Sequence, residues 1–414
     1  MPLPRNLPEP SPKRLAVRVT ADARRQLAAG HPWIYDRAIT SVTPGGRPGD
    51  LAVVFDDQRK FVAIGLYDPT SAIRIKILHR GAPTPIDAAF WQRRLDEAVA
   101  RRAPLLDDGR TTGYRCVHGE NDALPGLVLD RYGDTLVLKL YSAAWFAHLT
   151  TVLPVIVDTL RPANVVLRLA RAIAGSAPAG LDGEAIHGRL PDGPVLYDEL
   201  GLTFEADVVH GQKTGAFLDQ RDNRALVASM AAGCSVLDVF CATGGFGVHA
   251  AAAGARSVLG VDASEGALAA AQRNFALNGG LAAVAACEHT VEAGDAFEVM
   301  ERFGRQHRRF DIVVVDPPSF AQRESFVPRA LAAYGRLTER ALRLLAPGGL
   351  LVQASCSSRV TADEFVATVR GAAGRAGWDL RIVRQTAQPI DHPVGFPQGA
   401  YLKAVFARAE RLPA

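Results

Sequence analysis

Four segments in the second half of the chain are almost wholly apolar, and each ends in aspartate or small polar residues or leads directly into them: "SVLDVF", "SVLGVD", "FDIVVVDPP" and "GLLVQASC". Helical patterns separate them, including one in which Ser264 predicts the N-cap and Asn278 with Gly279 predicts the end. Strands that are apolar on both faces are typical of a parallel sheet covered by helices on both sides. The pattern predicts a doubly wound, Rossmann-like α/β domain over residues 191–414.

The chain before this domain divides into three stretches. Residues 1–14 are rich in proline and predict a disordered tail. Residues 15–82 contain short alternating runs separated by glycine and proline, which predicts a small β-rich domain. Residues 83–190 begin with a charged amphipathic helix pattern and continue with "GLVLDRYGDTLVLKL", which predicts a β-hairpin with its turn at residues 131–134. We expect this third stretch to form a central α+β domain.

Composition and charge limit the binding partners and the cellular compartment that we expect for this protein. The net charge of +4 and the isoelectric point of about 8.9 allow a local basic patch for nucleic acid without requiring one. No apolar run approaches the roughly 18 residues of a membrane span, so no membrane partner is expected. The five cysteines show no C-x-x-C spacing, so neither a metal nor a disulfide is predicted, and reduced thiols fit a cytoplasmic location.

The residues that follow the strands are the candidate ligand-binding groups, because doubly wound sheets bind ligands beyond the carboxyl ends of their strands. Thr243, Gly244 and Gly245 follow the first strand, and glycine lets a ligand approach the backbone closely. Asp262 ends the second strand, where a carboxylate suits the hydroxyls of a ribose. Asp295 follows the third, near the expected place of an adenine. A tight turn without a ligand and a solvated strand end are the competing interpretations.

The end of the fourth strand separates two cofactor classes. A dinucleotide fingerprint, G-x-G-x-x-A, matches residues 245–250 but lies inside the expected helix. Asp316, Pro317 and Pro318 instead form a rigid polar edge, because proline fixes φ and donates no N–H. Such an edge can hold a planar base, for which a dehydrogenase has no use; an ordinary turn is the alternative. The segment "DPPSF" resembles the Asp/Asn-Pro-Pro motif of class I S-adenosylmethionine methyltransferases that modify nucleobases.

Cys356 follows the last of the four strands, on the same expected edge as Asp316. Carbon C5 of cytosine becomes nucleophilic only after a thiolate adds to C6, so methylation at C5 needs one well-placed cysteine. A lone cysteine is more often a small core residue, but the flanking serines 355, 357 and 358 favour a loop. Cys241 is expected to pack beside the cofactor, and the remaining cysteines, 116, 234 and 287, lie outside the strand-end loops.

Taken together, these motifs resemble the bacterial large-subunit (23S-type) rRNA cytosine-C5 methyltransferases that carry an N-terminal PUA domain. "HPWIYDRAI" is similar to the PUA domain, "YRCVHGENDALPGLVLDRYGD" to the central domain and "GQKTGAFLDQRDNR" to the segment before the methyltransferase fold. "ATGGF", "VDAS", "VDPPSF", "ASCSS" and "DHPVGFPQGAYLKAV" follow in the family's order. The chain has no second cysteine in its Pro-Pro motif, so the base that removes the C5 proton is left unassigned.

The resemblance implies S-adenosylmethionine as the donor, no metal, and large-subunit rRNA as the partner. It implies Cys356 and Asp316 as catalytic residues. The cofactor-binding residues that we expect are Gln220, Phe240, Thr243, Gly244, Gly245, Asp262, Asp295, Asp316 and Pro317. The substrate-binding residues that we expect are Pro318, Phe320, Lys213, Arg221, Arg24 and Trp33. For Lys213 and Arg221 a structural role is the alternative, and for Arg24 and Trp33 an ordinary surface or core position.

Two other functions stay open at this point. One is methylation of another rRNA base atom, such as a guanine position or an exocyclic amine. The other is RNA binding without catalysis. A homodimer is compatible with either. The intact "ATGGF" and "DPPSF" motifs, together with Cys356, favour the cytosine-C5 methyltransferase.

Overall fold

The computed structural model describes residues 3, 7–177 and 180–412, which form two compact units. The first unit contains Met1–Leu200, Ala206–Leu218 and Ile390–Gly399. The second contains Gly201–Glu205, Asp219–Pro389 and Ala400–Ala414. Each unit therefore contains at least three separate stretches of the sequence.

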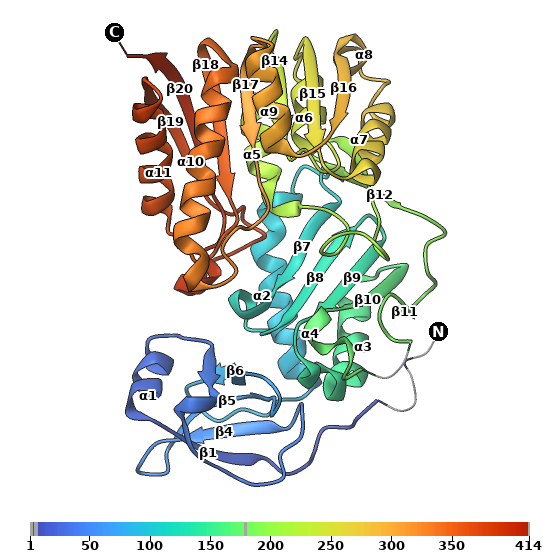
Figure 1. Ribbon diagram of the computed structural model, residues 1–414. Coiled ribbons are helices and arrows are strands. Elements are labelled where there is room, and N and C mark those ends of the chain that lie inside the picture. Colours follow the sequence, from blue (N-terminus) through green and yellow to red (C-terminus); the bar gives the residue numbers. More distant parts are fainter. Residues whose placement is uncertain (1–2, 4–6, 178–179, 413–414) are drawn as a thin grey trace. The chain divides into compact units, whose positions relative to one another are not determined.

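A six-stranded sheet occupies the N-terminal part of the first unit, in the order β2-β6-β5-β4-β1-β3. Its strands are β1 (Leu15–Val19), β2 (Trp33–Tyr35), β3 (Ile39–Val42), β4 (Leu51–Phe55), β5 (Phe61–Tyr67) and β6 (Ile73–Arg80). Figure 1 labels β1, β4, β5 and β6 of this sheet, drawn in blue. Helix α1 (Ala21–Ala28) lies between β1 and β2, and the 3-10 turn η1 (Asp36–Ala38) precedes β3. The Thr20 side chain caps α1 by accepting the Ala23 N–H at 3.3 Å. A β-rich region with one short helix is thus confirmed.

A five-stranded sheet follows in the order β11-β10-β9-β8-β7. Its strands are β7 (Gly113–His118), β8 (Leu127–Tyr132), β9 (Thr135–Leu140), β10 (Asn164–Leu169) and β11 (Ala185–His187). The predicted hairpin is β8–β9, and its turn is Gly133–Asp134. Helices α2 (Ala88–Leu106), α3 (Leu149–Leu160) and α4 (Arg171–Ala174) accompany the sheet, with the 3-10 turns η2 (Gly119–Asp122) and η3 (Ala143–His148). Strand β12 (Val195–Glu199) comes after them in the chain.

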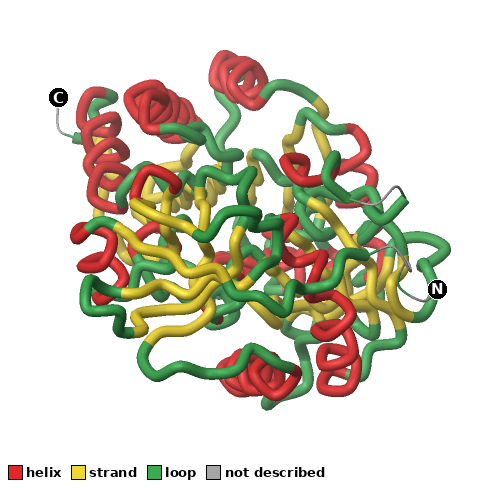
Figure 2. Tube along the Cα trace, turned by 90° about the horizontal axis from the view of Figure 1, so that it is seen from below, coloured by secondary structure: helices red, strands yellow, loops and turns green. Residues whose placement is uncertain are grey.

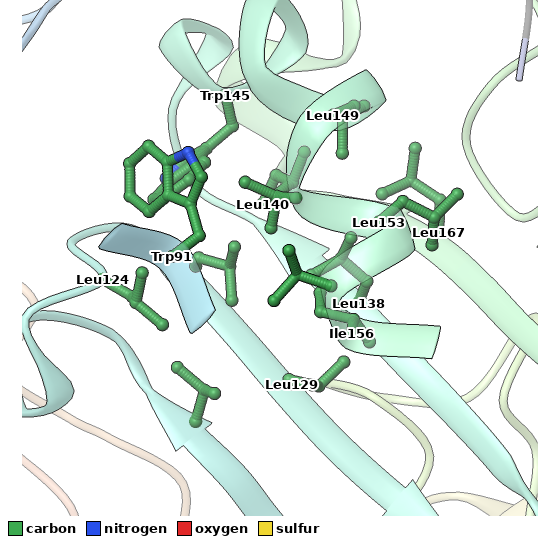
Figure 3. Close-up of a cluster of buried hydrophobic side chains, with 14 of the residues drawn as sticks. Trp91, Leu124, Leu129, Leu138, Leu140, Trp145, Leu149, Leu153, Ile156 and Leu167 are labelled. Atoms are coloured by element: carbon green, nitrogen blue, oxygen red, sulfur yellow. The ribbon is translucent and has the colours of Figure 1, made fainter. Parts of the chain in front are cut away.

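The core of this central region explains two departures from expectation. Trp91 of α2 and Trp145 of η3 pack among leucines of β8, β9 and α3 (Figure 3). The helical segment Ala143–Leu160 is long and apolar enough to cross a membrane, but 61% of it is buried inside the protein. Leu3 and Leu7 pack against the same cluster, so this part of the expected disordered tail is anchored; residues 1–2 and 4–6 lie outside the described chain.

A seven-stranded sheet forms the second unit, in the order β16-β15-β14-β17-β18-β20-β19. Its strands are β14 (Ser235–Val239), β15 (Ser257–Asp262), β16 (Glu288–Ala293), β17 (Phe310–Val315), β18 (Leu345–Ser355), β19 (Trp378–Thr386) and β20 (Lys403–Arg411). The first five run parallel to one another, whereas β20 runs antiparallel to both β18 and β19. This is the doubly wound α/β arrangement expected from the apolar runs.

Helices alternate with the parallel strands along the sequence of the second unit. They are α5 (Arg221–Ala228), α6 (Gly245–Ala252), α7 (Glu265–Leu277), α8 (Ala282–Ala286), α9 (Ala296–Arg305), α10 (Val327–Leu344) and α11 (Ala362–Arg375), with the 3-10 turn η5 (Glu324–Phe326). Figure 2 shows the described helices of the chain in red and the described strands in yellow. The predicted cap is confirmed, because Ser264 accepts the Ala267 N–H at 3.2 Å. Strand β13 (Leu202–Ala206) and the 3-10 turns η4 (Leu218–Gln220) and η6 (Pro397–Gly399) complete the described elements.

Candidate active site

The ends of β14, β15, β17 and β18 lie side by side at one edge of the sheet. In the parallel register Val239 pairs with both Val261 and Val315, and Val315 pairs with Gln353. The segments that follow these strands therefore begin at the same level. The Asp316 N–H also donates to the Val239 carbonyl at 3.3 Å. The structure thus brings together the strand-end residues that the sequence singled out in this domain.

The turn after β14 is held in a left-handed backbone conformation at three positions. The φ angles are 63° at Phe240, 47° at Ala242 and 78° at Gly244. A Cβ at Gly244 would lie 2.9 Å from the Ala271 Cβ, so a side chain there would collide. This combination of positive φ and close packing requires glycine at that point. Helix α6 begins at the next residue, Gly245, which confirms that the dinucleotide-like match lies within the helix.

Asp262 fixes this turn from the end of β15. Its Oδ2 accepts the Ala242 N–H at 3.0 Å, and its Oδ1 accepts the Ser264 N–H at 2.9 Å. Each carboxylate oxygen keeps one lone pair that a ligand hydroxyl could use. The neighbouring Thr243 carbonyl accepts from the Asn274 side chain at 2.9 Å. Asp262 is therefore both part of the turn and available to a bound ligand.

Asp238, next to the end of β14, is a buried acid that the sequence reasoning passed over. Only 1% of it is exposed, and neither of its carboxylate oxygens has a hydrogen-bond partner in the described chain. Burial is the main cause that raises its pKa to about 7; the Asp316 and Asp262 charges add to it, while the Gly247 N–H and Arg224 oppose it. Asp238 is therefore a buried acid that lies beside this turn with little hydrogen-bond support for its charged form.

Cys241 is confined within the same turn. It is 6% exposed, and a Cβ at Gly260 would lie 3.0 Å from its sulfur. Burial first, and then the Asp238 and Asp262 charges, raise the pKa of the Cys241 thiol. A buried thiol of raised pKa is a poor nucleophile. This environment fits the expected packing role of Cys241.

Cys356 lies immediately beyond β18 and is partly exposed. Its sulfur is 3.8 Å from the carbonyl oxygen of Pro317 in the Asp-Pro-Pro segment. The loop positions of Cys356 and Asp316 at one sheet edge agree with the sequence interpretation. Phe320 packs against Tyr334 with ring centroids 5.2 Å apart, whereas Pro318 is exposed and Pro317 is buried.

The serines beside Cys356 differ from expectation. Ser358 is exposed, but Ser355 and Ser357 are fully buried. The Tyr334 hydroxyl, on α10, lies 2.9 Å from the Oγ atoms of both Ser355 and Ser357. Ser357 Oγ also lies 3.1 Å from Ser319 Oγ. These two serines are therefore not solvated loop residues; their hydroxyls satisfy one another in a buried network that fixes the backbone on both sides of the cysteine.

Several other predicted site residues have structural surroundings. Asp295 is exposed and caps α9 by accepting the N–H groups of Phe297 and Glu298 at 2.9 and 3.1 Å. The Gln220 side chain is buried and accepts from Asn223 at 2.5 Å. Arg221 is only 1% exposed. A guanidinium buried to that degree favours the structural alternative for Arg221 over a contact with RNA phosphate.

The remaining substrate residues lie in the first unit. The Trp33 indole N–H donates to Glu120 at 2.9 Å, and its ring packs edge-on against Phe396 at 5.1 Å. Arg24 forms an ion pair with Asp57 at 2.6 Å. The ammonium of Lys213, which is exposed, lies 4.4 Å from the centre of the Phe217 ring. Trp33 and Arg24 are thus engaged in contacts within the first unit, and Lys213 is exposed.

No group of three or more histidine, cysteine, aspartate or glutamate side chains with metal-binding geometry occurs among the described residues.

Two residues beside the cysteine segment, Tyr334 and Lys403, were not predicted from the sequence. Lys403 stands in the quoted "YLKAV", but only the antiparallel pairing of β20 with β18 brings it next to Cys356.

Family models match the N-terminal part and the C-terminal part of the chain separately. A family model described as S-adenosylmethionine-dependent methyltransferase matches residues 176–408, and a PUA-like domain model matches residues 17–80. A "Ribosomal RNA large subunit methyltransferase" of Deinococcus radiodurans is 46% identical over 409 residues, covering 97% of this chain and 99% of the relative. A "Ribosomal RNA large subunit methyltransferase I" of Shewanella denitrificans is 36% identical, covering 95% and 99%.

Solved structures agree on the fold. SMU.776, assigned as a methyltransferase and solved in complex with SAH, superposes with a TM-score of 0.80 at 20% identity and covers 95% of this chain and 99% of its own. A protein of Streptococcus mutans assigned as S-adenosylmethionine-dependent superposes with a TM-score of 0.78, with the same identity and coverage. The chain belongs to the S-adenosylmethionine-dependent methyltransferase family, with a class I methyltransferase fold preceded by a PUA-like domain.

Proposed function

We propose that this protein methylates C5 of a cytosine in large-subunit rRNA and that Cys356 forms a transient covalent bond to the base. The observation that carries the proposal is the position of the Cys356 thiol. It is partly exposed at the carboxyl end of β18, and its sulfur lies 3.8 Å from the Pro317 carbonyl of the Asp-Pro-Pro segment. A nucleophile beside a base-holding edge suits a base whose reacting carbon must first be activated.

The cofactor half of the edge fits S-adenosylmethionine. Asp262 would receive the ribose hydroxyls through the lone pairs that its two backbone hydrogen bonds leave, and the left-handed turn through Phe240 and Gly244 sets the path of the backbone beside it. The proposed contacts also include Phe240, Thr243, Gly245 and Gln220, with Asp295 toward the adenine. When bound, the cofactor supplies an electrophilic methyl group.

The chain's own groups would divide the chemistry as follows. The Cys356 thiolate adds to C6, which forms an S–C6 bond and shifts electron density to C5. Asp316 accepts a hydrogen bond from the exocyclic amine and holds the ring, with Pro318 and Phe320 beside it. After C5 is methylated, a base removes the C5 proton, the S–C6 bond breaks, and the thiolate and the aromatic ring are restored.

The choice of RNA rests on the relatives. Two proteins named as large-subunit rRNA methyltransferases match nearly the whole chain at 46% and 36% identity, including the PUA-like region. In the first unit, the exposed Lys213 is the proposed phosphate contact, because a surface ammonium binds phosphate as a point charge.

The direct test is to identify the methylated nucleoside. Purified protein, labelled S-adenosylmethionine and unmodified 23S rRNA should yield labelled 5-methylcytidine after nuclease digestion and mass spectrometry. Cys356→Ala should yield none, whereas the matched control Cys234→Ala, which changes a partly exposed thiol outside the strand-end loops, should retain activity. Label in an N-methylated base or in a methylguanosine would overturn the assignment of C5.

A further inference from the structure

Lys403 lies beneath the segment that carries Cys356. It is the first residue of β20 and is the antiparallel partner of Ser355, the last residue of β18. It is only 8% exposed. A lysine is seldom buried to that degree unless its ammonium group is fully hydrogen-bonded. Its surroundings therefore show what the charge does.

Three backbone carbonyls accept hydrogen bonds from the Lys403 ammonium. They belong to Ser357 at 2.5 Å, Val360 at 2.6 Å and Tyr401 at 3.1 Å. An ammonium has three N–H donors, so every donor is used. A neutral amine has two, and its lone pair would face one of the carbonyls. The arrangement consequently favours the charged form, and two of its three bonds tie down residues 357–360.

No carboxylate neutralises this charge at ion-pair distance within the described residues. Burial lowers the pKa of Lys403 to about 8, whereas the Cys356 thiol and, next, Glu364 raise it. The coupling is reciprocal, because a thiolate that favours the ammonium is itself favoured by it. Tyr334 on α10 is also coupled to the cysteine: burial chiefly raises the pKa of its hydroxyl, and the charges of Cys356 and Asp316 add to the rise. Among these groups Lys403 is the one that carries positive charge.

We propose that Lys403 is a positioning residue for Cys356: its ammonium fixes the 356–360 segment through backbone carbonyls and stabilises the Cys356 thiolate. Near pH 7 the thiol proton is released to solvent while Lys403 stays protonated. The use of this thiolate in catalysis rests on the proposed function, but its effect on the thiol does not.

The test is the pH dependence of Cys356 alkylation in the full-length protein. Iodoacetamide is added across pH 6–10, and modification of each cysteine is followed by peptide mass spectrometry. In the wild type, the midpoint for Cys356 should lie below the ordinary cysteine value of about 8.5. Lys403→Met, which keeps the length of the side chain without its charge, should slow Cys356 alkylation about tenfold at pH 7 and move the midpoint upward. Lys403→Arg should restore part of the rate.

Cys234 is the internal control, since it is partly exposed in the same unit and lies just before β14, at the opposite end of that strand from the candidate site. Its alkylation should be the same in all three proteins, and S-adenosylmethionine binding should be unchanged by calorimetry. A wild-type midpoint at or above the ordinary value overturns the proposal even if Lys403→Met fails to fold. An unchanged profile in a folded Lys403→Met variant overturns it as well. Both results are independent of whether the wild type produces 5-methylcytidine, which tests the proposed function.

Discussion

Asp262 combines two hydrogen bonds to the backbone with a free lone pair on each carboxylate oxygen. Replacing it with alanine should weaken S-adenosylmethionine binding about ten- to a hundredfold, because a charge-assisted hydrogen bond contributes about 1.5–3 kcal/mol. Calorimetric titration measures the affinity. Asp379→Ala, an exposed acid at the start of β19, is the matched control and should leave the affinity unchanged. An unaltered affinity in Asp262→Ala would remove this residue from the cofactor site.

Asp238 should make stability depend on pH. Its pKa is about 7 in the folded protein and 3.8 ordinarily, so the folded state favours the protonated carboxyl. The contribution of Asp238 to the free energy of unfolding is therefore complete below pH 3.8 and is lost as the pH rises to about 7. Asp238→Asn removes that dependence. The free energy of unfolding, measured with urea in the absence of cofactor, should therefore rise in Asp238→Asn relative to the wild type by about 1 kcal/mol for each pH unit between pH 4 and 7. A difference that does not vary with pH contradicts the buried-acid account.

At this scale the sequence identifies the residues that end strands but not their burial. Asp262, Asp316 and Cys356 could be predicted because parallel strands place their carboxyl ends together. Arg221 could not be assigned, because a charged residue at the start of a helix fits a surface cation equally well, and the fold buries it. The burial of Ser355 and Ser357 could not be predicted for the same reason. Their hydroxyl groups bond to Tyr334, which lies on a helix distant in the sequence.

Helix α10 supports the cysteine segment through one hydroxyl group. Tyr334→Phe would leave the Oγ atoms of Ser355 and Ser357 with one partner fewer in a buried place. The free energy of unfolding should fall by about 1–3 kcal/mol, the cost of an unsatisfied buried polar group. Urea denaturation measures the loss. Tyr141→Phe removes a hydroxyl from a half-exposed tyrosine and should change stability by less than about 0.5 kcal/mol. Equal effects for both variants would refute the role of the network.

The elements themselves followed largely from local pattern. The buried parallel strands, the β8–β9 hairpin and the cap of α7 were predictable, because each depends on residues close in sequence. The position of β20 between β18 and β19 was not. Antiparallel insertion of the last strand is a property of the whole sheet, and it alone brings Lys403 beside Ser355.

For the molecule as a whole, the compact units differ from the linear blocks of the sequence. Segments Ala206–Leu218 and Ile390–Gly399 belong to the first unit although residues 191–414 were expected to form one domain. Asp391, fully buried, shows why: its carboxylate accepts the Arg115 N–H at 3.0 Å, and its carbonyl accepts from Arg102 at 2.9 Å. Such hydrogen bonds join residues far apart in the chain, so no local sequence pattern predicts them.

Asp391→Ala should therefore destabilise the first unit. Loss of an acceptor for a buried N–H costs about 1–3 kcal/mol, and amide exchange of Arg115 in β7 should accelerate. Hydrogen exchange with mass spectrometry measures both β7 and, as the control region, β15, whose exchange should not change. Faster exchange in β15 to the same extent would mean that the segment does not act on the first unit in particular.

The central claim is that Cys356 attacks cytosine, and RNA containing 5-fluorocytosine tests it most directly. Methyl transfer would leave fluorine where a proton must depart, so elimination stalls with the S–C6 bond intact. The account predicts an adduct that requires S-adenosylmethionine, survives denaturing electrophoresis and maps to Cys356 by mass spectrometry; Cys241→Ser retains it and Cys356→Ala does not form it. A Cys356→Ala protein that methylates RNA at the wild-type rate would contradict the covalent mechanism and point to an exocyclic amine or a ring nitrogen as the target.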